Sequence, residues 1–150
     1  MPIVYVGLGS NLGNRRRNIL DAVNLLTECL GTLVHLSSLH ETEPEGFQSD
    51  YLFLNAVAAF RTKLTPLKIL EVTQQVEHQL GRTRKSHDGI HYDRTIDIDL
   101  IYMEGITLHS ARLTLPHPRA AQRAFVLEPL REIAPAIAQE LERSATAANI

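Results

Sequence analysis

The feature that most constrains the fold is an alternation of apolar and acidic residues within residues 95–103. Three apolar side chains flank two carboxylates there, in the order Ile96, Asp97, Ile98, Asp99 and Leu100. A period of two places successive side chains on opposite faces of a sheet, so the segment is predicted to be a strand. Its two aspartates share one face, about 6.6 Å apart along the strand.

Two carboxylates on one strand face form a candidate magnesium site. Mg²⁺ takes oxygen ligands and keeps positions for water and substrate phosphate, and a pair of such ions suits phosphoryl transfer. Arg82, Arg84 and Arg94 stand just upstream, and guanidinium groups match phosphate oxygens in a fixed fork. An ordinary strand with one solvated face shows the same alternation. Asp is nevertheless disfavoured in strands, and like charges on one face repel unless a cation lies there.

The composition indicates a single domain over residues 1–150. An apolar content of 44% is enough for a core, and a net charge of −2 does not favour nonspecific nucleic-acid binding. Cys29 is the only cysteine, which favours a reducing compartment, and we expect it to be buried as a small apolar residue. The sequence shows neither a signal peptide nor a bilayer-length apolar run, so a cytoplasmic location without a membrane partner is expected.

Apolar periodicity and capping residues predict two main helices. The first spans residues 15–30, with Asn14 as its cap and Gly31 at its end. The second runs from Pro66, after the cap Thr65, to position 80. The expected inward residues of the first helix are Ile19, Ala22, Val23, Leu26 and Leu30, and those of the second are Leu67, Leu70, Thr73, Val76 and Leu80.

The remaining pattern completes an α+β fold. Besides residues 95–103, predicted strands cover residues 3–8, 33–39, 52–61 and 106–108, a long loop covers 40–50, and short helices cover 120–127 and 137–143. The order is the ferredoxin-like βαββαβ pattern, with an antiparallel sheet and helices on one face. The open face is then expected to carry Asp97, Asp99, Phe53 and Asn55.

Three positions fit a ligand as well as they fit the fold. Phe53 and Asn55 fall on one strand face, where an aromatic ring and an amide suit a flat heterocycle, or equally a core phenylalanine and an edge amide. His117 lies between two prolines that hold an extended backbone, where it donates to a phosphate or satisfies a buried carbonyl. Both readings stay open at each position.

Seven motifs stand in a fixed order between residues 4 and 135. They are G-S-N-L (9–12), T-x-P-x-G (42–46), F-L-N-A-V (53–57), G-R-x-R (81–84), R-T-I-D-I-D (94–99), R-L-T-L-P-H-P (112–118) and R-x-F-V-L-x-P-L (123–130). In this set the chain resembles the 6-hydroxymethyl-7,8-dihydropterin pyrophosphokinase family. It departs from the family pattern at His91 and Tyr92, where many members have tryptophan and glycine, and at Glu43 and Glu45.

The resemblance implies an ATP-dependent transferase of folate biosynthesis that gives AMP and the pterin diphosphate. It implies two Mg²⁺ ions on Asp97 and Asp99, with Arg82 and Arg94 as further catalytic residues. The residues implied for the pterin are Thr42, Glu45, Phe53, Asn55 and Phe125. The residues implied for ATP are Gln74, Glu77, Arg84, Arg112, Thr114, His117 and Arg123. A side-chain base or a metal-bound alkoxide would equally account for the loss of the hydroxyl proton.

Two other classes of protein share parts of this pattern. A nucleotidyl transferase would use the paired aspartates but needs a basic nucleic-acid track, which the net charge does not favour. A ligand-binding regulatory module would explain the fold, but not the aspartate pair together with the arginines. We therefore expect a monomeric enzyme that works on small molecules, without a nucleic-acid partner.

Overall fold

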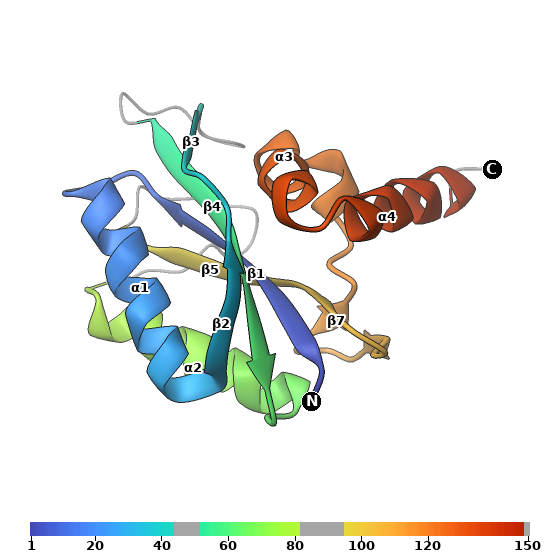
Figure 1. Ribbon diagram of the computed structural model, residues 1–150, viewed down its shortest axis with the longest axis horizontal. Coiled ribbons are helices and arrows are strands. Elements are labelled where there is room, and N and C mark those ends of the chain that lie inside the picture. Colours follow the sequence, from blue (N-terminus) through green and yellow to red (C-terminus); the bar gives the residue numbers. More distant parts are fainter. Residues whose placement is uncertain (44–51, 82–94, 149–150) are drawn as a thin grey trace.

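The computed structural model describes residues 1–43, 52–81 and 95–148, and the structural statements below concern these residues (Figure 1). The strands are β1 (Ile3–Ser10), β2 (Gly31–Leu36), β3 (His40–Thr42), β4 (Phe53–Thr62), β5 (Asp97–Met103), β6 (Leu108–His109) and β7 (Thr114–Leu115). The α-helices are α1 (Arg15–Leu30), α2 (Pro66–Gln79), α3 (Ala124–Ile133) and α4 (Pro135–Ala148), and a 3₁₀ helix spans Ala120–Gln122.

One antiparallel sheet carries the fold. Its order is β2–β4–β1–β5, and β3 also pairs with β4. Helix α1 joins the central strand β1 to the edge strand β2, and α2 joins β4 to β5. This is the ferredoxin-like α+β arrangement that the order of elements predicted.

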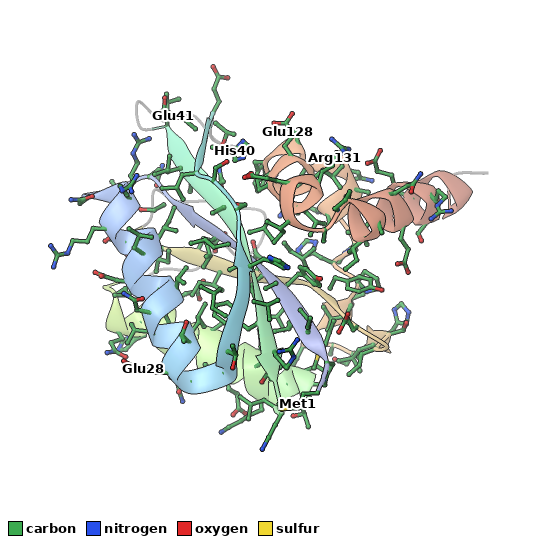
Figure 2. The ribbon with its side chains drawn as sticks, in the orientation of Figure 1. Met1, Glu28, His40, Glu41, Glu128 and Arg131 are labelled. Carbon is green, nitrogen blue, oxygen red and sulfur yellow. The ribbon has the colours of Figure 1, made fainter. Side chains whose placement is uncertain are left out.

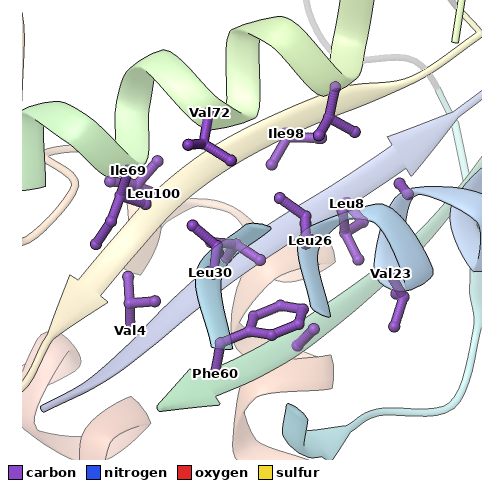
Figure 3. Packing of buried hydrophobic residues seen from close by; sticks show 14 of the residues in the cluster. Val4, Leu8, Val23, Leu26, Leu30, Phe60, Ile69, Val72, Ile98 and Leu100 are labelled. Carbon is purple, nitrogen blue, oxygen red and sulfur yellow. The ribbon is translucent and has the colours of Figure 1, made fainter. Parts of the chain in front are cut away.

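The main core lies between the sheet and the pair α1 and α2 (Figure 3). Alternate residues of β1, β4 and β5 point into it, among them Val4, Leu8, Phe60, Ile98 and Leu100. Burial of this apolar face is the main stabilising term, at about 25 cal/mol for each Å² removed from water. The opposite residues of the same strands are therefore left for the other face.

Helix α1 matches its prediction at both ends. The Asn14 side chain accepts a hydrogen bond from the Arg17 backbone N–H at 3.1 Å, and the five expected inward residues are buried. Gly31 ends the helix with φ of 145° and opens β2 directly. A Cβ on Gly31 would lie 2.2 Å from the Arg61 carbonyl oxygen, so only glycine fits this close approach between β2 and β4.

The prediction for the inner face of α2 was correct for Thr73 and Val76 and wrong for its three leucines. Leu67 is 38% exposed, and Leu70 and Leu80 are only partly buried. The residues that α2 buries are Ile69, Val72, Thr73, Val76 and Glu77. The prediction assumed that the leucines face inward and the carboxylates face solvent. The Glu77 carboxylate is instead buried against β5, where it accepts a hydrogen bond from a backbone N–H.

The second face of the sheet was expected to be open, but part of it is covered. Helices α3 and α4 lie on the side opposite to α1 and α2 (Figure 1). With the 3₁₀ helix they form a second apolar cluster, which includes Tyr5, Val57, Ile101, Leu130 and Leu141. They pack over Tyr5, Val57 and Ile101 on this face, while Asp97 and Asp99 of β5 remain only partly buried.

Other boundaries also differ from their predictions. Strand β2 ends at Leu36 instead of residue 39, and β3 occupies the first residues of the expected loop, because both segments pair with the long strand β4. Ile106 makes an isolated bridge to Met103, while Leu108 pairs with β7. The expected helix over 120–127 is a 3₁₀ turn followed by the longer α3, and the last helix begins at Pro135 and extends to Ala148.

Two remaining expectations concern single features. Cys29 is exposed, because Leu30 takes the inward position at the end of α1. Within the described ranges, no helix combines the length and the apolar character that a bilayer crossing requires.

Candidate functional site

The candidate site lies on the second face of the sheet, at the start of β5. Gly9 of β1 pairs with Asn55 of β4 on one side and with Asp97 of β5 on the other. In the next row on this face, Gly7 pairs with Val57 and with Asp99. The two rows place the expected metal carboxylates and the expected pterin amide on the same face.

The two glycines keep the central strand free of side chains between these groups. A Cβ on Gly9 would lie 2.9 Å from Asn55 Oδ1 and 3.5 Å from Phe53 Cδ1. A Cβ on Gly7 would lie 3.3 Å from Ile101 Cδ1. The close approach of the Asn55 and Phe53 side chains to β1 therefore depends on glycine at position 9.

The two carboxyl groups of β5 lie close enough to interact strongly. Burial, followed by the charge of Asp97, raises the pKa of Asp99 to about 8, and a hydrogen bond between the two side chains adds to this shift. Two neighbouring carboxylates repel each other, so the state in which both are ionised is disfavoured. A cation between them would remove the repulsion and restore both carboxylates.

Arg123 and His117 approach this pair from the C-terminal part of the chain. The Arg123 guanidinium lowers the pKa of Asp99, which partly opposes the effect of burial. Burial, then Arg123 and Arg119, lower the pKa of His117 to about 4, so its imidazole is neutral at pH 7. His117 Nδ1 accepts a hydrogen bond from the Arg119 backbone N–H at 3.1 Å, which places the ring proton on Nε2.

Glu77 has a structural contact that its predicted ATP-binding role did not anticipate. Its side chain is buried, and its Oε2 accepts a hydrogen bond of 2.8 Å from the Ile98 backbone N–H. Ile98 stands between the two aspartates. Glu77 thereby joins α2 to the strand that carries the carboxylate pair, and its charge also raises the pKa of Asp99.

The expected pterin residues form a second group beside the carboxylates. Asn55 is buried, and its Nδ2 donates a hydrogen bond of 2.6 Å to Thr42 Oγ1. This contact fixes the amide, so Oδ1 is the atom on the Gly9 side. Phe53 is buried on the same face, and the Phe125 ring lies 5.6 Å from the Arg123 Cζ atom in a cation–π contact.

Some predicted residues are not gathered into this group. Gln74 is exposed on α2, Arg112 is exposed between β6 and β7, and Thr114 is partly buried in β7. Glu45, Arg82, Arg84 and Arg94 lie outside the described residues, as do His91 and Tyr92. The assignment of these residues to substrates stays a prediction.

The carboxylate pair fits a magnesium ion better than a metal held by protein ligands alone. Among the described residues, no group of three or more His, Cys, Asp or Glu side chains is placed to hold a metal. Mg²⁺ commonly uses one or two carboxylates and completes its shell with water and substrate phosphates. Asp97 and Asp99 match that donor set, and their mutual repulsion, which contributes to the raised pKa of Asp99, is the kind of interaction that a bound cation would relieve.

Sequence reasoning missed three contributors to this region. Gly7 and Gly9 leave β1 without side chains on the face between β4 and β5. Their spacing of two residues in a strand was the signal that could have predicted this. Glu132 of α3 was also missed. It contacts the segment between β2 and β3, which is distant in sequence, and local pattern carries no signal of that contact.

The chain matches the family model described as 7,8-dihydro-6-hydroxymethylpterin-pyrophosphokinase (HPPK) over residues 5–135. It is 48% identical over 136 residues to a Porphyromonas gingivalis protein named 2-amino-4-hydroxy-6-hydroxymethyldihydropteridine pyrophosphokinase, covering 90% of this chain and 92% of that protein. A Bacillus subtilis protein of the same name is 40% identical over 148 residues, covering 98% of this chain and 84% of that protein.

Solved structures of low sequence identity share the fold. A wild-type Plasmodium falciparum HPPK-DHPS structure has a TM-score of 0.66 at 17% identity, covering 89% of this chain and 38% of that chain. An HPPK-DHPS complex with substrates has a TM-score of 0.68 at 16% identity, covering 89% of this chain and 40% of that one. This chain thus spans about two fifths of those longer chains.

Proposed function

The chain belongs to the 7,8-dihydro-6-hydroxymethylpterin-pyrophosphokinase family, and we propose on that basis that it transfers pyrophosphate from ATP to 6-hydroxymethyl-7,8-dihydropterin. The products are AMP and the pterin diphosphate, an intermediate of folate biosynthesis. The names of the relatives support the reaction, and the match over residues 5–135 covers most of the chain.

One observation carries the proposal at the level of residues. Asn55 and Asp97 flank Gly9 in a single row across the sheet, on the face opposite to α1 and α2. An amide suited to a heterocycle thus lies beside a carboxylate suited to a phosphate-bound cation. Phosphoryl transfer of this kind depends mainly on positioning and charge stabilisation, and this row supplies the relative placement.

The heterocycle end of the site is assigned to β3, β4 and α3. Because Asn55 Nδ2 is bonded to Thr42, its Oδ1 is the atom that would accept hydrogen bonds from the pterin edge. Phe53 and Phe125 supply aromatic surface for stacking. The backbone near Thr42 and the residue Glu45 complete the predicted set, with Glu45 outside the described residues.

The phosphate end is assigned to Asp97, Asp99, His117 and Arg123. The two aspartates would hold Mg²⁺, two ions in our proposal, which neutralise charge on the phosphates when bound. The neutral His117 would donate from Nε2 to a phosphate oxygen, and the Arg123 guanidinium would bind a further phosphate oxygen. Gln74, Glu77, Arg112 and Thr114, with Arg82, Arg84 and Arg94 outside the described residues, complete the proposed nucleotide and catalytic set.

The test is an assay of the nucleotide product. Purified protein is incubated with MgATP, with and without 6-hydroxymethyl-7,8-dihydropterin, and nucleotides are separated by chromatography. We expect AMP that depends on the pterin, and its loss in Asp97→Ala and Asp99→Ala variants whose circular dichroism matches the wild type. ADP would instead identify an ordinary kinase, and wild-type protein without turnover would refute the proposal.

The proposal extends to the cellular setting. We propose a monomer in the cytoplasm whose required partners are its small-molecule substrates, in keeping with the pathway that the relatives' names indicate. Size-exclusion chromatography with light scattering tests the monomer, and a dimer mass would refute it.

A further inference from the structure

The chain leaves the sheet ladder between β2 and β3, and the break lies beside the candidate site. Ser37 keeps contact with β4, because its backbone N–H donates to the Val57 carbonyl and its Oγ accepts from the Val57 N–H, both at 2.9 Å. Ser37 Oγ also donates to the Ser38 carbonyl at 2.9 Å. Ser38 is therefore the residue at which the backbone turns from β2 toward β3.

Glu132, near the end of α3, binds this turn through both of its carboxylate oxygens. The Ser38 backbone N–H donates to Glu132 Oε2 at 2.9 Å, and the Ser38 hydroxyl donates to Oε1 at 2.8 Å. These bonds lower the pKa of Glu132, with the backbone bond from Ser38 as the largest cause. Its neighbour Arg131 pairs with Glu142 of α4, whereas the Glu132 carboxylate binds the β2–β3 turn.

His40, the first residue of β3, completes what we call the Glu132 cluster, made of Ser38, His40 and Glu132. His40 Nε2 lies 3.2 Å from Glu132 Oε1 and 3.2 Å from Ser38 Oγ. The carboxylate can only accept, and the Ser38 hydroxyl uses its proton on Glu132, so Nε2 must carry a proton and donate. Figure 2 shows His40 between β3 and α3.

Both elements joined by the Glu132 cluster carry proposed pterin residues. On β3, Thr42 stands two residues after His40, on the same face, and holds Asn55 through their hydrogen bond. On α3, Phe125 lies seven residues before Glu132, about 10 Å along the helix axis. The cluster therefore ties the helix of one proposed stacking ring to the strand that orients the amide.

We propose that Glu132 is a positioning residue, which fixes α3 and its Phe125 relative to the Thr42 and Asn55 side of the pterin site by binding Ser38 and His40. This inference rests on the proposed function, because the pterin is the ligand whose affinity it explains. Glu132 is 40% exposed, and its hydrogen bonds within the described residues go to Ser38 and His40, so its effect passes through the placement of the two elements.

The test compares Glu132→Gln with Glu128→Gln in the full chain. Gln keeps the size of the side chain but loses its charge and one acceptor oxygen, while Glu128 is an exposed residue one turn earlier on α3. We expect Glu132→Gln to raise the KM for the pterin about tenfold, the effect of losing one charged hydrogen bond. The KM for ATP and the kcat should stay within twofold of wild type, and Glu128→Gln should match wild type throughout.

Two further measurements separate placement from general damage. Thermal unfolding checks that Glu132→Gln is folded, and hydrogen exchange at the Ser38 amide should be faster in that variant alone. A His40→Gln variant keeps an N–H donor toward Glu132 and should retain most of the pterin affinity, whereas His40→Ala should lose it.

The outcomes distinguish this inference from the function on which it rests. Wild-type protein that forms no AMP refutes the proposed function, and the inference falls with it. Active wild-type protein with an unchanged pterin KM in Glu132→Gln refutes the positioning role alone. An equal rise of the ATP and pterin KM values would also refute it, because a structural loss affects both substrates.

Discussion

Asn55 and Asp97 are both paired with Gly9, one from each side, so a single glycine separates the proposed pterin amide from a proposed metal carboxylate. Adjacent strands lie about 4.8 Å apart, so the two residues are separated by about 10 Å across the sheet. The hydroxymethyl group and the phosphates would meet within this span. The side-chain-free strip of β1 is thus part of the site and not only of the fold.

The first prediction concerns Gly9→Ala. The added methyl would lie 2.9 Å from Asn55 Oδ1, and the bond from Nδ2 to Thr42 opposes rotation of the amide. We expect a stability loss of about 1–3 kcal/mol from overpacking and a pterin KM at least about tenfold higher, measured by urea unfolding and steady-state kinetics. Gly7→Ala, whose methyl would meet only the flexible end of Ile101 at 3.3 Å, should cost less stability. An unchanged pterin KM in Gly9→Ala would contradict the role given to Asn55.

The second prediction concerns the pH dependence of the metal-free protein. The pKa of Asp99 is raised to about 8 in the folded state, so the folded chain holds a proton that the unfolded chain has already released. The free energy of unfolding should therefore fall as pH rises toward the folded pKa, by roughly 1–2 kcal/mol from this group between about pH 6.5 and 8, and should level off above about 8. Urea unfolding in EDTA measures it.

The matched variant for this test is Asp99→Asn, which removes the titrating group and, in our proposal, is expected to abolish turnover. It should show a smaller fall over the same pH interval and a higher Tm at pH 9, by about 2–4 °C for each kcal/mol in a chain of this size. Equal pH profiles for wild type and variant would show that Asp99 is not the group responsible.

The third prediction concerns Glu77, which joins α2 to β5. Glu77→Ala leaves the Ile98 N–H buried without its acceptor, so we expect a loss of about 2 kcal/mol in the free energy of unfolding. Glu77→Gln keeps an acceptor oxygen and should lose less. The control is Glu71→Ala on the same helix, whose exposed pair with Lys68 contributes at most about 0.5 kcal/mol. Equal losses for Glu77→Ala and Glu71→Ala would rule out the buried hydrogen bond as a stabilising contact.

The fourth prediction concerns the junction between α1 and β2. A Cβ on Gly31 would lie 2.2 Å from the Arg61 carbonyl oxygen, at a φ of 145° that side chains rarely adopt. Gly31→Ala should lose at least about 3 kcal/mol in urea unfolding, because strain and overpacking add. Gly105→Ala, with a φ of 71° but no neighbour within 4 Å, should lose only about 1 kcal/mol. A smaller loss at position 31 than at 105 would overturn this account.

Local chemistry predicted α1 and β5 well. Asn14, an apolar stripe and Gly31 define α1 without help from the rest of the chain, and the structure reproduces both bounds. The prediction of the inner face of α2 was partly wrong because it assumed that carboxylates face solvent. Glu77 is instead buried against Ile98. The sequence did not predict strand β3, because its three residues form a strand only through their pairing with β4.

Sequence alone was enough to predict the order of the main elements β1, α1, β2, β4, α2 and β5, the shared face of Asp97 and Asp99, and, through its motifs, the family. These follow from backbone periodicity and residue type, which act over a few residues. The folded structure was needed to place Gly9 between Asn55 and Asp97 and to show that Glu132 binds Ser38, 94 residues away in the sequence. Such contacts depend on register and on the packing of α3 over the sheet, where many residues act together to bring distant groups within hydrogen-bond distance.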